Sequence, residues 1–410
     1  MRNTNTTKII IMTICGLFLF IKYIAQLFPS LIGPDLMKHY ALSALDLGVL
    51  ASSYYYSYSF MQIVSGWLLD RFSIRLVATA AIAILASSLL LFAQYHSFFI
   101  MCLSRVFMGV GASFATVLYM KCAAIWTQPK TFGIIASLLA TATMFGAAFG
   151  GAPLAYLFHV LTWRDGLFSI GLISLTLALI SFLIISDVRT HDSNAQSNII
   201  PFSQLKNIFM NKHNLLLMGY SGLVFSPVVI MGGLWGTPFL VLKYHLSTEQ
   251  VSYLLSIMFI GIAIGAPIWS FIAVYFKNRH ALMQTANLFS LISICCIIYG
   301  TFSYTQEAIL FFILGFSVGC FMFSFSICRD INPLALLGFA FAFINTGEGI
   351  IGSFLEPAIG AVLDITKAHH ATFSMSNYHL ALILLPICFI LAALLLAILK
   401  RNIPQHFLTP

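Results

Sequence analysis

Four ionisable residues lie inside long apolar stretches of the sequence: Lys22, Arg105, Glu348 and Glu356. Burying an ionisable group in an apolar segment is costly, so such residues mark candidate functional sites. A lysine or arginine there can bind a substrate anion, and arginine can do so through two parallel hydrogen bonds. Burial favours the protonated form of a carboxylic acid, which suits a glutamate to proton transfer near neutral pH. The four charges sum to zero, so they could also pair with one another.

The two cations are the candidate binding groups for a substrate anion. We predict that Lys22 binds or orients a substrate carboxylate, with Tyr23 and Gln26 beside it on the same stretch. The alternative is a lysine that extends its ammonium group to the nearer membrane interface. We predict that Arg105 holds an anion or adjusts a nearby acid, the alternative being hydrogen bonds to backbone carbonyls.

The two acids are candidate proton-coupling residues. Glu348 is flanked by Gly347 and Gly349, so another backbone or a ligand can come close to it. Glu356 precedes Pro357, which frees a carbonyl group and bends a helix. Eight residues on one helix span about 12 Å and turn through about 80°, so both acids cannot touch one small group. Asn345, on the same stretch, completes the candidate substrate-binding set.

The composition identifies the elements that must position these residues. Of 410 residues, 60% are hydrophobic and 8% are charged, and the mean hydropathy is +0.97. Soluble domains carry about 25% charged residues. The apolar runs are continuous, without the alternation of a β-barrel, so the backbone polar groups must be satisfied within helices. Twelve membrane-spanning helices are predicted near residues 9–32, 47–69, 76–94, 98–120, 132–158, 166–186, 215–242, 251–276, 281–303, 307–328, 334–363 and 378–399.

The distribution of Lys and Arg predicts the orientation of the chain. There are 20 of these residues, two of which are Lys22 and Arg105. If both termini are cytoplasmic, four of the other 18 lie on the outer side (Lys38, Arg164, Lys243 and Lys367) and 14 on the cytoplasmic side. This follows the positive-inside rule. It also explains the net charge of +8 by contact with the lipid bilayer and without nucleic acid.

An internal repeat appears when the sequence is shifted by 204 residues. The pairs that coincide are Pro34 and Pro238, Leu42-Ser43 and Leu246-Ser247, Arg75 and Arg279, Gly111 and Gly315, and Pro153 and Pro357. Parallel repeats about an axis along the membrane normal are one known plan of transporters. We therefore predict two pseudo-symmetric six-helix bundles, residues 1–186 and 214–410, joined by a cytoplasmic linker of residues 187–213.

A charged turn follows the second predicted helix. Gly66 begins a stretch in which Asp70 lies close to Arg71 and Arg75. A carboxylate beside two cations at a membrane face can pair with the end of a neighbouring helix and part from it at modest cost. We predict that this turn is a conformational switch. The alternative is a plain positive-inside turn, which leaves Asp70 unexplained.

The same turn, read as Gly66 to Arg75, resembles the G-x-L-x-D-R-x-G-R signature of the major facilitator superfamily, with Ser73 in place of the usual glycine. Arg105 to Ala112 is similar to the family's R-x-x-x-G-x-G-A segment, and Trp163 to Phe168 to its W-R-x-x-F element. The stretch from Asn345 to Asp364 resembles the family's eleventh helix. The resemblance covers the whole chain. It implies transport by alternating access between the two bundles.

These observations predict a secondary active transporter for a small polar, carboxylate-bearing metabolite, namely an organic acid, amino acid, short peptide or siderophore. We expect proton coupling, as in a symporter, a multi-pass location in the bacterial inner membrane, and a monomer. Neither a cofactor nor a metal is expected, and no catalytic residue is assigned. The alternatives are a proton-driven exporter of a drug or siderophore, a sensor that binds substrate without transporting it, and an intramembrane enzyme. The last would need a nucleophile and base or a metal set at membrane depth, and the sequence carries neither pattern.

Overall fold

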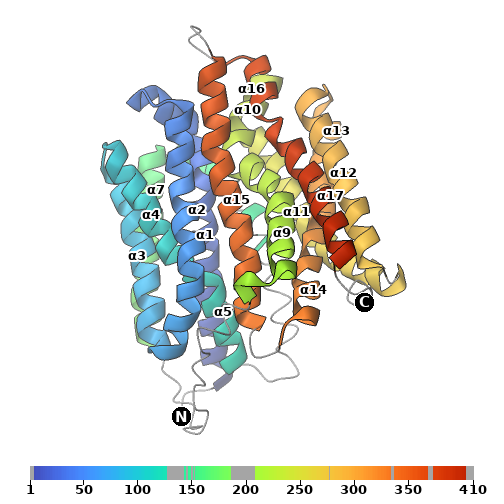
Figure 1. The fold of residues 1–410 in the computed structure, drawn as a ribbon. Helices are drawn as coiled ribbons and strands as arrows, with labels where there is room; N and C mark the ends of the chain where they lie inside the picture. Colours follow the sequence, from blue (N-terminus) through green and yellow to red (C-terminus); the bar gives the residue numbers. More distant parts are fainter. Residues whose placement is uncertain are drawn as a thin grey trace.

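The computed structural model describes residues 4–126, 143–144, 146–148, 151, 153–185, 208–276, 278–333, 337–367 and 373–402. Every regular element within these ranges is a helix, as Figure 1 shows. This confirms the all-helical class expected from the composition. The proposed linker, residues 187–213, and the fifth expected span, residues 132–158, lie largely outside the described residues.

Two sets of helices can be defined by their place in the chain. The N-terminal helices are α1 (Thr4–Tyr40), α2 (Ala44–Arg71), α3 (Ile74–Gln94), α4 (Phe98–Ala112), α5 (Phe114–Trp126) and α7 (Trp163–Ile184). The C-terminal helices are α9 (Lys212–Ile230), η1 (Met231–Trp235), α10 (Gly236–Tyr244), α11 (Thr248–Phe276), α12 (Arg279–Tyr299), α13 (Tyr304–Val318), η2 (Gly319–Met322), α14 (Phe323–Ile331), α15 (Leu337–Thr366), α16 (Met375–Ala381) and α17 (Leu384–Asn402).

Ten helical stretches in the described part of the chain are long and apolar enough to cross a membrane. They match ten of the twelve expected spans, the other two being the partly described fifth span and the second span. The second span is present as α2, a helix of 28 residues. Its polar side chains include Ser52, Ser59, Gln62 and Ser65, all of them buried. These residues lower its hydropathy while facing other helices rather than lipid.

Four expected single helices are divided by local irregularities, and the twelfth span is the one divided into α16 and α17. The fourth span is divided into α4 and α5, and the tenth contains the 3₁₀ turn η2. The seventh span contains the π-helical turn η1 between α9 and α10. Pro227 lies inside α9, four residues before η1 begins. π-helical turns in transmembrane helices often occur at functional sites, and apolar runs do not reveal them.

Helices α2 and α15 lie side by side and connect the two sets (Figure 1). Glycines allow this close approach. A Cβ atom on Gly48 would lie 2.7 Å from the backbone of Glu356 and Pro357, and one on Gly360 would lie 2.3 Å from the Ala44 carbonyl oxygen. Helix α15 also packs against α9 on its other side. Small residues serve this purpose in membrane proteins, where the backbones of packed helices come close.

The upper face in Figure 1, where α2 begins and α15 ends, holds a polar contact between the two sets. Ser43 caps α2 and accepts a hydrogen bond from the backbone N–H of Asp46. The backbone N–H groups of Ala44 and Leu45 donate to the two carboxylate oxygens of Asp364, at 2.9 and 2.7 Å. The carboxylate therefore satisfies two free N–H groups at a helix end that favours negative charge.

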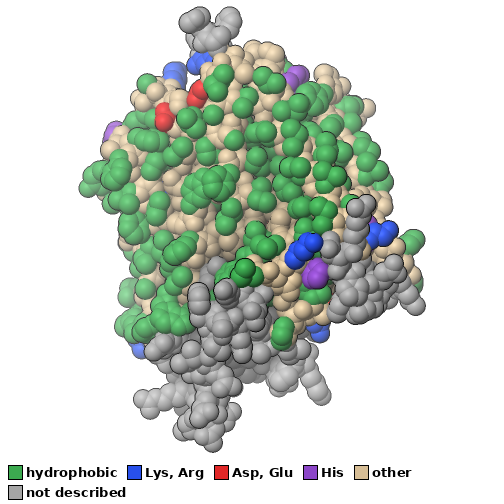
Figure 2. Space-filling view, viewed as in Figure 1, with side chains coloured by type: hydrophobic (Ala, Val, Ile, Leu, Met, Phe, Trp, Pro, Cys, Tyr) green, Lys and Arg blue, Asp and Glu red, His purple; other side chains and the backbone are tan. Residues whose placement is uncertain are grey.

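The surface fits a protein surrounded by lipid. Figure 2 shows hydrophobic side chains over most of the visible face, with charged side chains gathered near its upper and lower ends. Exposed apolar residues such as Phe60, Ile173 and Phe271 are more than 60% accessible in the isolated chain. Large exposed apolar surface of this kind marks a face that contacts lipid or protein.

Candidate functional site

Arg105 lies on α4 and is completely buried. Its Nε donates to the Leu50 carbonyl at 3.4 Å and its Nη2 to the Ala51 carbonyl at 3.1 Å, while Nη1 donates to the carbonyl of Ala25. The aromatic ring of Tyr54 lies 4.8 Å from the guanidinium carbon. Arg105 therefore joins α4 to the backbones of α1 and α2. This geometry corresponds to the alternative weighed for Arg105, in which backbone carbonyls are its partners.

Lys22 lies on α1, is 6% exposed, and faces aromatic rings. Its Nζ atom lies 4.3 Å from the ring centroid of Tyr23 and 5.0 Å from that of Tyr58 on α2. Among the residues described, no carboxylate lies within ion-pairing distance of this ammonium group. Glu348 is close enough for the two charges to attract each other. Lys22 is thus a buried cation whose contacts are mainly aromatic.

Glu348 lies on α15 and is 9% exposed. Its Oε1 accepts a hydrogen bond of 2.8 Å from the hydroxyl of Ser221 on α9. The flanking glycines have different neighbours: a Cβ on Gly347 would lie 2.5 Å from the Met218 carbonyl oxygen, and one on Gly349 would lie 2.1 Å from the Ser59 hydroxyl. The glycines therefore allow α9 and α2 to pack closely against α15 on either side of Glu348.

Glu356 lies two helical turns further along α15 and is completely buried. The hydroxyl of Ser52 on α2 is 3.4 Å from Oε2, whereas Oε1 has no hydrogen-bond partner. A side chain at Gly233 would meet both the Tyr55 hydroxyl, at 3.2 Å, and Glu356 Oε1, at 3.5 Å. Gln26 Nε2 in turn donates to the Tyr55 hydroxyl at 3.2 Å. Gln26, which is partly exposed, and the buried Tyr55 and Glu356 thus form a polar group between α1, α2 and α15.

Tyrosine and tryptophan side chains donate hydrogen bonds to two backbone carbonyls near Glu356. Pro357 has no N–H, so the Ser353 carbonyl four residues earlier loses its helical partner. The hydroxyl of Tyr56 on α2 donates to that carbonyl at 3.0 Å. Trp235 Nε1 donates to the Glu356 carbonyl at 3.1 Å. The bend that the sequence predicts at Pro357 is therefore bound by side chains from both sets of helices.

A second polar chain includes Asn345, at the opposite end of the site. Asn345 Nδ2 donates to Gln62 Oε1 at 2.8 Å, and Gln62 Nε2 is 3.5 Å from the hydroxyl of Tyr58. Tyr58 is one of the rings beside Lys22. Gln62 was not predicted as a site residue from the sequence, although its position four residues after Tyr58 places both residues on one face of a helix.

The expected switch lies at the lower end of α2, away from these residues. The side chains of Asp70 and Arg71 lie outside the described residues. The guanidinium carbon of Arg75 lies 4.0 Å from the ring centroid of Phe182 on α7. Lys121 on α5 donates to the Leu69 carbonyl near the end of α2. Gly66 has no atom within 4 Å of the position that a Cβ would take.

The site as described therefore combines residues that sequence reasoning had named separately. Lys22 and Gln26 come from α1, and Glu348 and Glu356 come from α15, with the tyrosines of α2 between them. Arg105 binds backbone carbonyls of α1 and α2. It is also close enough to Glu356 for electrostatic attraction. In the described residues there is no cluster of three His, Cys, Asp or Glu side chains that could hold a metal.

Comparison with known proteins gives consistent matches. A family model described as Major Facilitator Superfamily matches residues 12–355. The Bacillus subtilis protein named "Uncharacterized transporter YybO" is 23% identical over 406 residues, which cover 91% of each chain. The Escherichia coli "Probable L-galactonate transporter" is 22% identical over 378 residues, covering 85% of this chain and 81% of the relative.

Among solved structures, a bacterial homologue of the human lysosomal transporter Spinster, in an inward-facing and occupied conformation, has the same fold. Its TM-score is 0.76 at 16% sequence identity, and the match covers 96% of each chain. The family match extends over most of the sequence, and the family's members are transporters rather than enzymes. The chain belongs to the major facilitator superfamily of transporters.

Proposed function

We propose that this protein is a secondary active transporter that carries a small carboxylate-bearing metabolite across a bacterial inner membrane by alternating access. In this proposal residues 1–186 and 214–410 form the two halves, residues 187–213 link them, and both termini face the cytoplasm. The upper face in Figure 1 then faces outward. The substrate site lies between α1, α2 and α15, and transport is coupled to protons.

The observation that carries the proposal is the environment of Lys22. A buried ammonium group is costly unless an anion or a set of acceptors compensates it. Here the described contacts of Lys22 are the rings of Tyr23 and Tyr58 and a hydrogen bond with the Tyr58 side chain, which attract a cation but do not neutralise it. A substrate carboxylate would supply the missing charge. Gln26 and Asn345 lie on either side and could bind its other polar groups.

The acids on α15 supply a mechanism for proton coupling. When Glu348 is ionised, it attracts Lys22 and competes with the substrate for that charge. A proton on Glu348 removes the competition, so Lys22 becomes available to the substrate carboxylate. Glu356 has the same relation to Arg105, with one carboxylate oxygen free of hydrogen bonds. We propose Glu348 as the principal proton-coupling residue and Glu356 as the secondary one.

The contacts between the two sets of helices support alternating access. On the upper face Asp364 binds the start of α2, and below this face the buried Ser256 on α11 donates to the Ala148 carbonyl at 2.6 Å. These bonds are few and polar, so they can be exchanged for water when the face opens. At the lower end we propose that Asp70, Arg71 and Arg75, with Gly66 before them, form the corresponding switch.

The name of the relative from Escherichia coli suggests a first substrate to test. It is called a probable L-galactonate transporter, and L-galactonate is a carboxylic acid with hydroxyl groups along its chain. Uptake of labelled acid into proteoliposomes with a proton gradient tests transport directly. It also separates a carrier from a sensor that binds substrate without moving it.

The decisive variant is Lys22→Gln, which keeps hydrogen bonding but removes the charge. We expect it to weaken binding of L-galactonate at least about fivefold, because hydrogen bonds to charged groups exceed neutral ones by about 1 kcal/mol or more. Lys38→Gln is the matched control, since Lys38 is exposed at the end of α1. Equal affinities of Lys22→Gln and the wild type would refute Lys22 as the carboxylate-binding group.

A further inference from the structure

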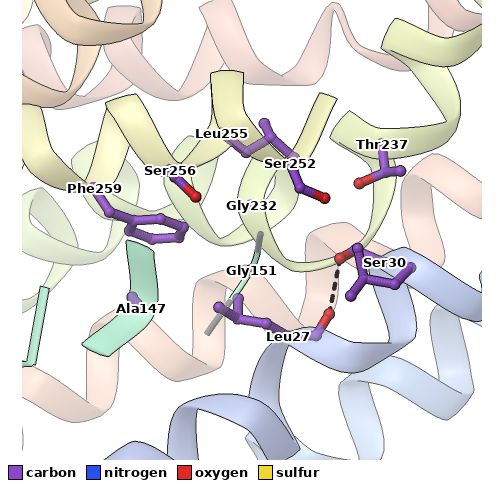
Figure 3. Close-up of a pocket in the computed structure, with 11 residues that line it drawn as sticks. Leu27, Ser30, Ala147, Gly151, Gly232, Thr237, Ser252, Leu255, Ser256 and Phe259 are labelled. Atoms are coloured by element: carbon purple, nitrogen blue, oxygen red, sulfur yellow. Dashed lines mark hydrogen bonds between the residues drawn. The ribbon is translucent and has the colours of Figure 1, made fainter. Parts of the chain in front are cut away.

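A second polar site lies above Lys22, where α1, η1, α10 and α11 meet the described residues near position 150 (Figure 3). Four hydroxyl-bearing residues line this pocket: Ser30, Thr237, Ser252 and Ser256. All four are more than nine-tenths buried. The remaining lining is apolar or glycine, and no ionisable side chain takes part. The pocket is therefore polar but uncharged.

The hydroxyl hydrogen atoms of the three serines already form hydrogen bonds to backbone carbonyls. Ser30 donates to the Leu27 carbonyl at 2.8 Å, Ser252 to the Thr248 carbonyl at 2.8 Å, and Ser256 to the Ala148 carbonyl. A hydroxyl oxygen that donates once can still accept two hydrogen bonds. The serines therefore present hydrogen-bond acceptors to the pocket.

Thr237 supplies the fourth hydroxyl group, and it has no partner. Its side chain is 1% exposed, and Oγ1 makes no hydrogen bond in the structure. In Figure 3 this hydroxyl and that of Ser252 point toward each other across the pocket. A buried polar atom without a partner is unusual in a folded protein and calls for an explanation such as a bound ligand or water.

The pocket lies further along α1 than the site around Lys22. Lys22, Gln26 and Ser30 are spaced four residues apart, so neighbours in this series are separated by about 6 Å along the helix and by about 40° around it. Gly232 lines the pocket, and the next residue, Gly233, faces Tyr55 and Glu356. A ligand whose charged end is at Lys22 can thus extend past Gln26 toward Ser30.

We propose that the hydroxyl groups of Ser30, Thr237, Ser252 and Ser256 form a subsite for the hydroxylated end of the transported acid. The inference rests on the proposed function of Lys22, which holds the other, charged end. A carboxylate is disfavoured here because it would find no cation and at most two free donors among the four hydroxyls, namely Thr237 and, once the upper face opens, Ser256. An ammonium group is disfavoured because no carboxylate compensates it. Substrate hydroxyl groups match the site, because they can donate to the serines and accept from Thr237.

The present conformation leaves space in the pocket for about one water molecule. The subsite is therefore contracted here, with room for no more than about one substrate hydroxyl group. As the upper face opens, the helices that form the pocket separate and the hydroxylated end of the substrate can enter. The transported molecule is, on this reasoning, a polyhydroxylated acid rather than a simple fatty or dicarboxylic acid.

Binding to purified protein tests the subsite with two acids, L-galactonate and hexanoate, the latter having no hydroxyl group on its chain. Thr237→Val removes the hydroxyl and keeps the shape, and Ser252→Ala removes one acceptor. We expect each variant to weaken binding of L-galactonate about tenfold and to leave binding of hexanoate unchanged. Thr237→Ser should restore the affinity. Ser174→Ala is the control, because Ser174 is a buried serine on α7 that also donates to a carbonyl in its own helix.

The subsite and the proposed function fail in different ways. If Thr237→Val and Ser252→Ala retain the full preference for L-galactonate over hexanoate, the hydroxyl subsite is wrong while Lys22 keeps its role. The proposed function is wrong if Lys22→Gln binds both acids as the wild type does, or if the wild type binds neither acid. In either case the proposed hydroxyl subsite is wrong as well.

Discussion

The contact between Asp364 and the start of α2 predicts how strongly the upper face is held closed. Asp364→Asn keeps the size of the side chain and removes its charge. One of the two oxygens that accept from Ala44 and Leu45 then becomes an amide nitrogen, which cannot accept a hydrogen bond. The change should therefore weaken a contact that exists in this conformation and is broken when the face opens.

The size of the effect follows from the type of bond. A hydrogen bond to a charged group contributes about 1.5–3 kcal/mol, and interaction with the helix end adds less than about 1 kcal/mol when the group is partly exposed. Asp364 is partly exposed, so we take the lower end, about 1.5 kcal/mol. This corresponds to a shift of about tenfold in the ratio of open to closed upper faces.

Distances between spin labels can measure that ratio. Labels at Lys38, at the end of α1, and Thr248, at the start of α11, lie on exposed positions of the two sets of helices. We expect Asp364→Asn to enlarge the long-distance population about tenfold. Asp35→Asn, which removes an exposed carboxylate near the end of α1, should leave the distribution unchanged. An identical distribution for Asp364→Asn and the wild type would refute the reasoning.

Three further predictions concern the support of the site and the topology. Arg105→Met should lower the free energy of unfolding by about 3 kcal/mol or more, because the three hydrogen bonds that the guanidinium donates to buried carbonyls are lost. Unchanged thermal stability in detergent would contradict this. Tyr56→Phe should cost about 1 kcal/mol through the Ser353 carbonyl, measured in the same way. In a cysteine-free background, a cysteine at Lys38 should react with an impermeant thiol reagent in intact cells, and one at Lys400 should not. Labelling of position 400 from outside would overturn the proposed orientation.

Much of the fold could be predicted from the sequence, because backbone polar groups in lipid must form hydrogen bonds within the protein. Long apolar runs must form helices, and ten of the expected spans appear as helices of suitable length in the described residues. The breaks within the fourth, seventh, tenth and twelfth spans were not predicted. They depend on local packing, such as the π-helical turn at Met231–Trp235, and leave the hydropathy unchanged.

The ionisable residues of the candidate site could be predicted from the sequence, whereas most of the contacts that these residues make could not. An isolated charge in an apolar run is conspicuous, so Lys22, Arg105, Glu348 and Glu356 emerged from the sequence. Their partners did not, because carbonyls such as that of Ala25 are invisible in a sequence. The same holds for residues whose partners lie far away in the chain. Asp364 binds backbone groups some 320 positions earlier, and no local sequence pattern predicts that contact.

The central claim is that a proton on Glu348 frees Lys22 for the substrate carboxylate, and transport by Glu348→Gln tests it most directly. This variant imitates the protonated acid permanently, so exchange of labelled for unlabelled L-galactonate across proteoliposome membranes should continue. Accumulation driven by a pH gradient should be lost, because the variant can no longer release the proton. If Glu348→Gln still accumulates substrate against its gradient in the same vesicles, Glu348 is not the coupling acid and the account is contradicted.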